Sequence, residues 1–222
     1  MDFEESLRLS IALGLTIFLV LLRFDSDRIM RSDYFRYRYP WLGPLSYYGL
    51  VVAFAMGIAL ILPDGQTWLF LAPGDPDSML PIMLLFSAVG VLNAIAFAFR
   101  WYGGITPLPT PLLVPRLLGA AASAIADELQ FRSIVLGILI FADIPGGIGA
   151  ALVIQALLYG LAQRRLWRER QWYFLLGSVL LGYGAGLATV TAGSIVPAIV
   201  GHFAVMAALF AFAGGRLRTR PI

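Results

Sequence analysis

The segment Asp127-Glu128-Leu129-Gln130-Phe131-Arg132 places two adjacent carboxylates and an arginine inside an apolar run that spans residues 113–142. An ionised side chain at membrane depth costs on the order of a few kcal/mol, so it normally faces a protein interior or a water-filled cavity. Arg132 lies four residues after Glu128, which puts both on one helical face and lets them pair. The segment therefore indicates a buried polar site in a chain that otherwise partitions into lipid.

Composition indicates an integral membrane protein. Apolar residues make up 59% of the 222-residue chain, charged residues make up 13%, and the mean hydropathy is +0.82. Soluble domains are about half apolar and about a quarter charged. At about 20 residues per crossing, the length allows about seven or eight transmembrane helices and leaves no room for a soluble domain. We therefore expect an all-α polytopic bundle in which residues 1–222 form a single integral membrane domain.

The residue inventory also excludes several function classes. The chain has no cysteine, which excludes disulfides, iron–sulfur clusters and thiol catalysis. The net charge is +3, and the arginines that produce it lie mainly in the segments beside the apolar runs. A positive charge at this position suits an anionic lipid leaflet. We therefore expect membrane lipids as partners and no nucleic acid.

The apolar runs are separated by short polar segments. The fourth run is ambiguous, because it is either one long tilted helix or two short helices broken near Asp127, which would give eight spans. The runs cover residues 6–22, 45–62, 79–99, 113–142, 147–163, 173–190 and 194–214.

Arginine placement favours a single crossing for the fourth run. Residues 23–44 carry five arginines, whereas residues 63–78 carry three aspartates and no arginine. Arginine-rich loops stay in the cytoplasm, so the first loop is cytoplasmic and the second is outside. One crossing then puts both the loop 164–170 and the tail after residue 214 in the cytoplasm. We expect seven spans in a prokaryotic plasma membrane, with the N-terminus outside and the C-terminus cytoplasmic.

Polar side chains recur at helical spacing in three of the last four runs. Such side chains avoid lipid, so we expect the three sets to face one another around a shared cavity. The sets are Ser123, Asp127 and Gln130 in the fourth run, Gln155, Tyr159 and Gln163 in the fifth, and His202, the only histidine, in the seventh.

Three short motifs follow one another in these runs. The first contains the paired acids and the arginine, the second ends in glutamine, and the third begins with the histidine. They read Asp127-Glu128-x-x-x-Arg132, Tyr159-x-x-x-Gln163 and His202-x-x-x-Met206.

The order and spacing of these motifs resemble the CPBP family, the CAAX-prenyl-protease and bacteriocin-processing membrane proteins. The resemblance covers residues from about 113 to 214, and the first half of the chain matches only in being helical. The family pattern is Glu-Glu-x-x-x-Arg, then Phe-x-x-x-His, then His-x-x-x-Asn or Asp. A Ser-(Ile/Leu)-x-Pro-Ala-Ile run often precedes the last motif, and residues 194–199 keep it.

The resemblance implies a hydrolase that works inside the membrane. In the family pattern the first glutamate and the second motif's histidine activate a water, while the later histidine and asparagine hold the oxyanion. These roles map here to Asp127, Gln163, His202 and Met206. Glutamine cannot exchange a proton near neutral pH, and a thioether cannot donate a hydrogen bond. The departures therefore predict an impaired catalytic site.

We interpret Asp127, Glu128, Arg132, Gln163 and His202 as the remains of a catalytic constellation. The predicted function is binding, as a scaffold or accessory subunit of a complex with another membrane protein. The alternative is an active intramembrane endopeptidase of the CAAX-processing type that uses the paired acids and the histidine. A small transporter or channel is weaker, because no inverted repeat is visible.

Each candidate residue also has a purely structural interpretation. Glu128 and Arg132 would be an ion pair that fastens the helix, His202 a core histidine bonded to a backbone carbonyl or to Asp127, and Gln163 a boundary residue. We expect no metal and no other cofactor, because one histidine beside an Asp-Glu pair offers few ligands for a metal ion. A catalytic zinc usually takes three protein ligands.

Overall fold

The computed structural model describes residues 3–30, 42–107, 109–163 and 172–214. Within these ranges the chain is helical apart from short turns and connecting segments, and it contains no strand. The prediction of an all-α bundle is confirmed. The elements are α1 (Phe3–Met30), α3 (Leu42–Ile61), α4 (Gly65–Trp68), α5 (Pro76–Tyr102), α6 (Thr110–Glu128), η1 (Leu129–Val135), α7 (Leu136–Phe141), α8 (Gly147–Ala162), α9 (Trp172–Ala192) and α10 (Val196–Ala213).

The fourth apolar run forms one unbroken helical rod. Helix α6, the π-helical turn η1 and helix α7 follow one another without a gap from Thr110 to Phe141, so the chain does not reverse direction near Asp127. At about 1.5 Å per residue, such a rod is longer than the roughly 30 Å hydrocarbon layer. We call this rod the central helix.

Five helices within the described ranges are long and apolar enough to cross a membrane. They correspond to α1, α3, α5, α9 and α10. Helix α8 is apolar but shorter, with 16 residues, and the central helix carries the buried charges. The count of seven spans remains a prediction that includes these last two.

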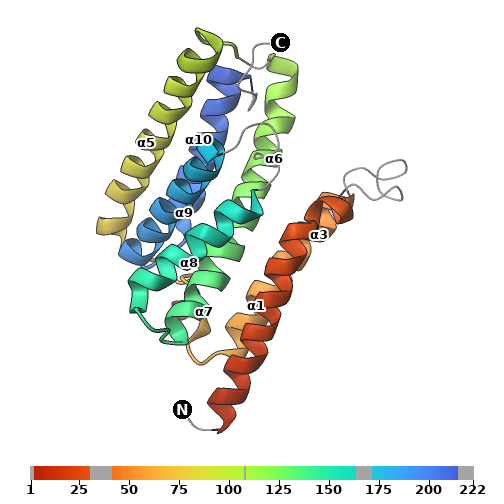
Figure 1. The fold of residues 1–222 in the computed structure, drawn as a ribbon, viewed down its shortest axis with the longest axis vertical. Coiled ribbons are helices and arrows are strands. Elements are labelled where there is room, and N and C mark those ends of the chain that lie inside the picture. The colour runs from red at the N-terminus through yellow and green to blue at the C-terminus, as the bar shows by residue number, and fades with distance from the viewer. Residues whose placement is uncertain (1–2, 31–41, 108, 164–171, 215–222) are drawn as a thin grey trace.

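The bundle has two parts that meet at the central helix (Figure 1). Helices α5, α9 and α10 lie together on one side, with α8 across them, and the α1–α3 hairpin lies on the other side. Helix α10 packs along α5, where a side chain on Gly201 would overlap the Phe86 ring. Helix α9 packs against α8, where Gly182 lets Ala156 and Tyr159 approach its backbone. Glycine therefore allows the close contacts that place Tyr159 and His202, one residue after Gly201.

Helix α1 is longer than the apolar run predicted. The sequence prediction ended the run at residue 22 and placed Arg23 in a cytoplasmic loop, but α1 continues to Met30. Arg23 therefore lies on the helix, one turn after the buried Leu19. The loop assignment of Arg23 was wrong because a side chain with a buried acidic partner can stay within the span. The arginine-rich loop 164–170 and the tail after residue 214 lie outside the described residues.

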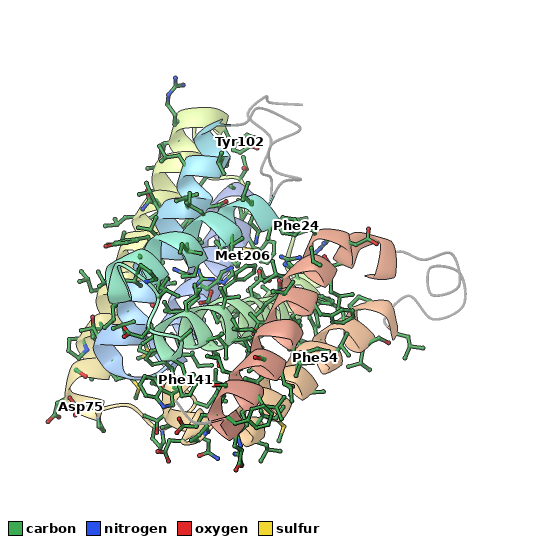
Figure 2. All side chains as sticks on the ribbon, turned by 60° about the horizontal axis from the view of Figure 1, so that its bottom comes forward. Phe24, Phe54, Asp75, Tyr102, Phe141 and Met206 are labelled. Atoms are coloured by element: carbon green, nitrogen blue, oxygen red, sulfur yellow. The ribbon has the colours of Figure 1, made fainter. Side chains whose placement is uncertain are left out.

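Helix α5 runs from one end of the bundle to the other and begins at an acidic cap. In Figure 2, Asp75 and Tyr102 mark opposite ends of α5. Asp75 caps the start of the helix, where its carboxylate accepts from the backbone N–H groups of Asp77 and Ser78. The acidic end belongs to the loop predicted to lie outside.

We predict that a cysteine introduced at Asp77 reacts with an impermeant thiol reagent added to intact cells, whereas a cysteine at Ile105 does not. Both side chains are exposed; Asp77 lies in the first turn of α5, and Ile105 lies beyond the other end of the same helix. The chain has no cysteine of its own to interfere. Labelling of Ile105→Cys but not Asp77→Cys would invert the topology, and labelling of both would reject α5 as a span.

Candidate functional site

The two acids sit where the central helix changes its hydrogen-bonding pattern. Asp127 and Glu128 end α6, and the π-helical turn begins at Leu129. Short π-helical turns inside α-helices often occur at functional sites. The residues from Gln130 to Val135 are all buried, so this turn lies at the centre of the bundle.

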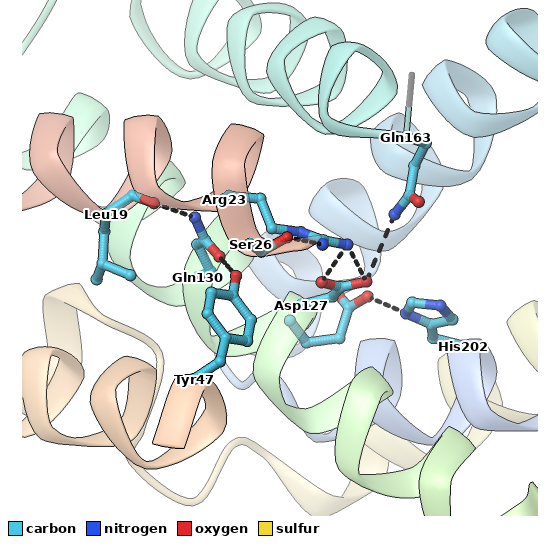
Figure 3. Close-up of polar contacts among 9 residues, drawn as sticks. Leu19, Arg23, Ser26, Tyr47, Asp127, Gln130, Gln163 and His202 are labelled. Carbon is cyan, nitrogen blue, oxygen red and sulfur yellow. Dashed lines mark hydrogen bonds and ion pairs between the residues drawn. The ribbon is translucent and has the colours of Figure 1, made fainter. Parts of the chain in front are cut away.

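Asp127 is held between two other helices. Its Oδ1 lies 3.1 Å from Nη2 of Arg23 on α1, and its Oδ2 accepts from the same nitrogen at 3.4 Å. Oδ2 also accepts from Nε2 of Gln163, just after α8, at 3.5 Å. Only 4% of the residue is exposed. Both carboxylate oxygens are therefore engaged by protein groups (Figure 3).

Glu128 is paired with the histidine. Its Oε1 lies 2.7 Å from Nδ1 of His202 on α10, and its Oε2 lies 2.9 Å from Nε of Arg132. The glutamate is fully buried. The histidine is therefore bonded to Glu128, whereas the structural interpretation of the sequence had it bonded to a backbone carbonyl or to Asp127.

Arg132 is charge-paired but poorly hydrogen-bonded. It is fully buried, and its nitrogens have no aligned hydrogen-bond acceptor among the described residues, although Nε is close to Glu128. The short distance shows an ion pair, and the missing alignment shows that it is not a directed hydrogen bond. The guanidinium carbon lies 4.2 Å from the centre of the Tyr159 ring. A desolvated cation over an aromatic face gains about 2 kcal/mol, which offsets part of the cost of burial.

The four charges balance within the cluster. Asp127 is opposed by Arg23, and Glu128 is opposed by Arg132. An unpaired buried ion costs several kcal/mol even after relaxation, so the two acids require these two cations. The site is electrically neutral while His202 is neutral.

Not all the predicted polar residues face one shared cavity. Gln130 turns toward the hairpin, where its Oε1 accepts from the Tyr47 hydroxyl at 2.8 Å and its Nε2 donates to the Leu19 carbonyl at 2.9 Å. Gln155 donates to the Gly182 carbonyl of α9 at 2.8 Å. Asp127, Gln163, Glu128 and His202 do meet. The prediction of one common cavity is corrected, because two of the glutamines bind neighbouring helix backbones instead.

An apolar pocket opens between α1, the central helix and α8. Its volume is about 250 Å³, and its lining contains none of the charged site residues. The lining residues are Leu13, Thr16, Ile17, Val20, Leu21, Val135, Ile138, Leu139 and Leu158. The described residues also contain no group of three or more histidine, cysteine or acidic side chains placed to hold a metal ion.

The cluster has one arrangement that can exchange protons. A carboxylate that accepts from Nδ1–H fixes the tautomer of an imidazole and leaves Nε2 as a base. Glu128 and His202 have this geometry. Asp127 has no imidazole beside it, because Gln163 occupies that place. One helical turn after His202, Met206 is half-buried and supplies only a thioether.

Sequence reasoning missed Arg23, which pairs with Asp127 in the site, and Tyr47, which binds Gln130 beside the site. Both come from the first half of the chain, where no motif resembles a known family. Arg23 directly follows the apolar run 6–22, so its position in the sequence indicated a helix boundary and not a buried partner for Asp127.

Comparison with known protein families found a match, which lies almost entirely in the second half of the chain. A family model described as "Type II CAAX prenyl endopeptidase Rce1-like" matches residues 109–208. No curated protein and no solved structure matches the chain. The matched region contains the acids, Arg132, Gln163 and His202 and excludes Arg23 and Tyr47.

We predict that Arg132→Ala lowers the free energy of unfolding by about 3–5 kcal/mol, because it leaves Glu128 buried without its cation. The double change Glu128→Gln with Arg132→Met should cost less than the single change. It removes both charges and keeps an acceptor for His202. Denaturation in mixed detergent micelles measures both.

The matched control is Arg116→Ala, which removes an exposed arginine from the same rod and should change stability by about 0.5 kcal/mol or less. Equal stabilities for Arg132→Ala and Arg116→Ala would contradict the buried-pair assignment.

Proposed function

We propose that this membrane protein, whose residues 109–208 match the model of the type II CAAX prenyl endopeptidase Rce1-like family, is a member with impaired catalysis that acts by binding. The family match confirms the resemblance found in the sequence. The proposed role is a scaffold or accessory subunit for another membrane protein, in a prokaryotic plasma membrane. The N-terminus would lie outside and the C-terminus in the cytoplasm.

The state of Asp127 is the observation that carries this proposal. Asp127 occupies the position where the family pattern has its water-activating glutamate. Here both of its oxygens are engaged, chiefly by Arg23 from a helix outside the matched region. A general base must lie within hydrogen-bond reach of the water that it activates. A water that approaches this carboxylate must compete with the Arg23 guanidinium and the Gln163 amide for its oxygens.

The neighbouring substitutions support the same conclusion. Gln163 contacts Asp127 where the pattern has histidine, and an amide cannot accept the proton. Met206 stands where the pattern has asparagine, and loss of one oxyanion donor costs about 100- to 1,000-fold in rate. Aspartate is also one methylene shorter than glutamate, and a displacement of about 1 Å can cost about 100-fold. These losses are not additive, but each acts on the same step.

The alternative function is an active endopeptidase, and the geometry of Glu128 and His202 favours it. Their 2.7 Å contact orients an imidazole against a carboxylate, as in sites where histidine is the general base. In this alternative the second acid and His202 replace the pair that the family pattern uses. The two functions differ in one measurable property, the hydrolysis of a membrane-embedded or prenylated peptide.

We predict that the purified protein in lipid does not hydrolyse prenylated CAAX peptides or membrane-spanning peptides. Asp127→Ala should leave this result unchanged. The triple change Asp127→Glu, Gln163→His and Met206→Asn should recover measurable turnover only when combined with Arg23→Leu, because Arg23 otherwise still occupies the carboxylate. The matched control is the same triple change with Arg23 retained.

Hydrolysis by the wild-type protein that His202→Ala or Glu128→Ala abolishes would establish the endopeptidase instead. Each variant must keep the melting temperature of a folded protein for this comparison to count. Turnover in the triple variant with Arg23 retained would show that Arg23 does not block the acid.

A further inference from the structure

Helix α5 carries a polar side chain on its lipid-facing surface. Asn93 is exposed and lies within the apolar span Pro76–Arg100. It is seven residues from Arg100, or about 10 Å along a helix, which places it inside the roughly 30 Å hydrocarbon layer. Of the side-chain amides on described membrane helices, Asn93 is the one that is exposed.

The helix satisfies only part of this amide. Nδ2 of Asn93 donates to the Val89 carbonyl at 2.9 Å. The amide has a second N–H and a carbonyl oxygen, and neither has a partner among the described residues. Hydroxyls elsewhere in the spans avoid this problem by bonding to the carbonyl four residues earlier, as Thr16 and Thr189 do. An amide in lipid with free bonding capacity is stabilised by a partner helix.

Asn93 belongs to an exposed stripe with helical spacing. Residues 85, 89, 93, 96 and 100 follow one another at intervals of three or four, so they share one face. All five are exposed: Leu85, Val89, Asn93, Ala96 and Arg100. Ala96, one turn from the amide, is a small residue of the kind that allows two membrane helices to approach closely.

The position of α5 places Leu85, Val89, Asn93 and Ala96 on the outer surface of the bundle. Figure 1 shows α5 at the edge of the bundle, on the side away from α1 and α3. Its other face, which includes Phe86 and Gly90, packs against Gly201 and Val205 of α10. The stripe is therefore separate from the candidate site and from the surface that holds the bundle together.

We propose that the α5 stripe is a dimer interface between two copies of this chain, in which the Asn93 amides pair across a two-fold axis along the membrane normal. A primary amide is self-complementary, because it donates and accepts equally well. Two copies inserted in the same orientation place Asn93 at the same depth, which a helix of another protein does only by coincidence. A two-fold interface uses the same patch on both partners.

The first test uses disulfide trapping in native membranes, since the chain has no cysteine. Ala96→Cys should form a product of twice the chain mass on mild oxidation, because a disulfide requires Cα atoms about 4.4–6.8 Å apart. The control is Leu157→Cys on the exposed face of α8, which should stay monomeric. No dimer from Ala96→Cys overturns the proposal, and so does a product whose mass shows a different partner.

The second test measures the role of the amide. Asn93→Leu should weaken self-association of labelled protein in liposomes by about 3- to 30-fold, the range given by interhelical hydrogen bonds of about 0.6–2 kcal/mol. Asn93→Gln should restore most of the affinity, because it returns the amide at the same position. Equal association of the wild-type and Asn93→Leu proteins, both folded by thermal melting, would overturn the pairing.

Discussion

Burying two adjacent carboxylates in a membrane bundle is the constraint on which this structure depends. Neighbouring residues on a helix point about 100° apart, so one partner cannot serve both acids. Asp127 is bound from the side of α1 and the end of α8, whereas Glu128 is bound by Arg132 of its own helix and by His202 of α10. These contacts place three helices around the centre of the rod.

Because of this constraint, the two halves of the chain supply different charges to the site. The region that matches the family supplies both acids but only one of the two arginines. The second arginine comes from α1, and the same hairpin supplies the Leu19 carbonyl and the Tyr47 hydroxyl to Gln130. The hairpin therefore completes the charge balance of the site as well as covering it. Asp127 is thus neutralised by a cation from outside the region that matches the family model.

The fold was largely predictable from the sequence because lipid imposes a strong signal. Apolar runs mark the spans, and the predicted run 113–142 corresponds to one continuous helical rod from Thr110 to Phe141. The pairing of Glu128 with Arg132 was also predictable from their spacing. Such patterns act along one helix, where sequence distance and spatial distance agree.

Contacts between helices were harder to predict. Arg23 looked like a loop residue, because an arginine at the end of an apolar run usually marks the cytoplasmic boundary. Its partner lies 104 positions away in sequence, and nothing local identifies it. Gln130 and Gln155 shared the spacing of the site residues, yet they bond to the backbones of α1 and α9. The π-helical turn after Glu128 likewise has no signature in the residue pattern.

The central claim is that Arg23 holds Asp127, and a double-mutant cycle tests it most directly. Arg23→Met, Asp127→Asn and their combination are compared with wild type by unfolding in mixed micelles. The account predicts a coupling energy of about 1–3 kcal/mol, because the second change costs little once the first partner is gone. Additive effects, with a coupling energy near zero, would contradict the ion pair and leave the carboxylate free to act as a base.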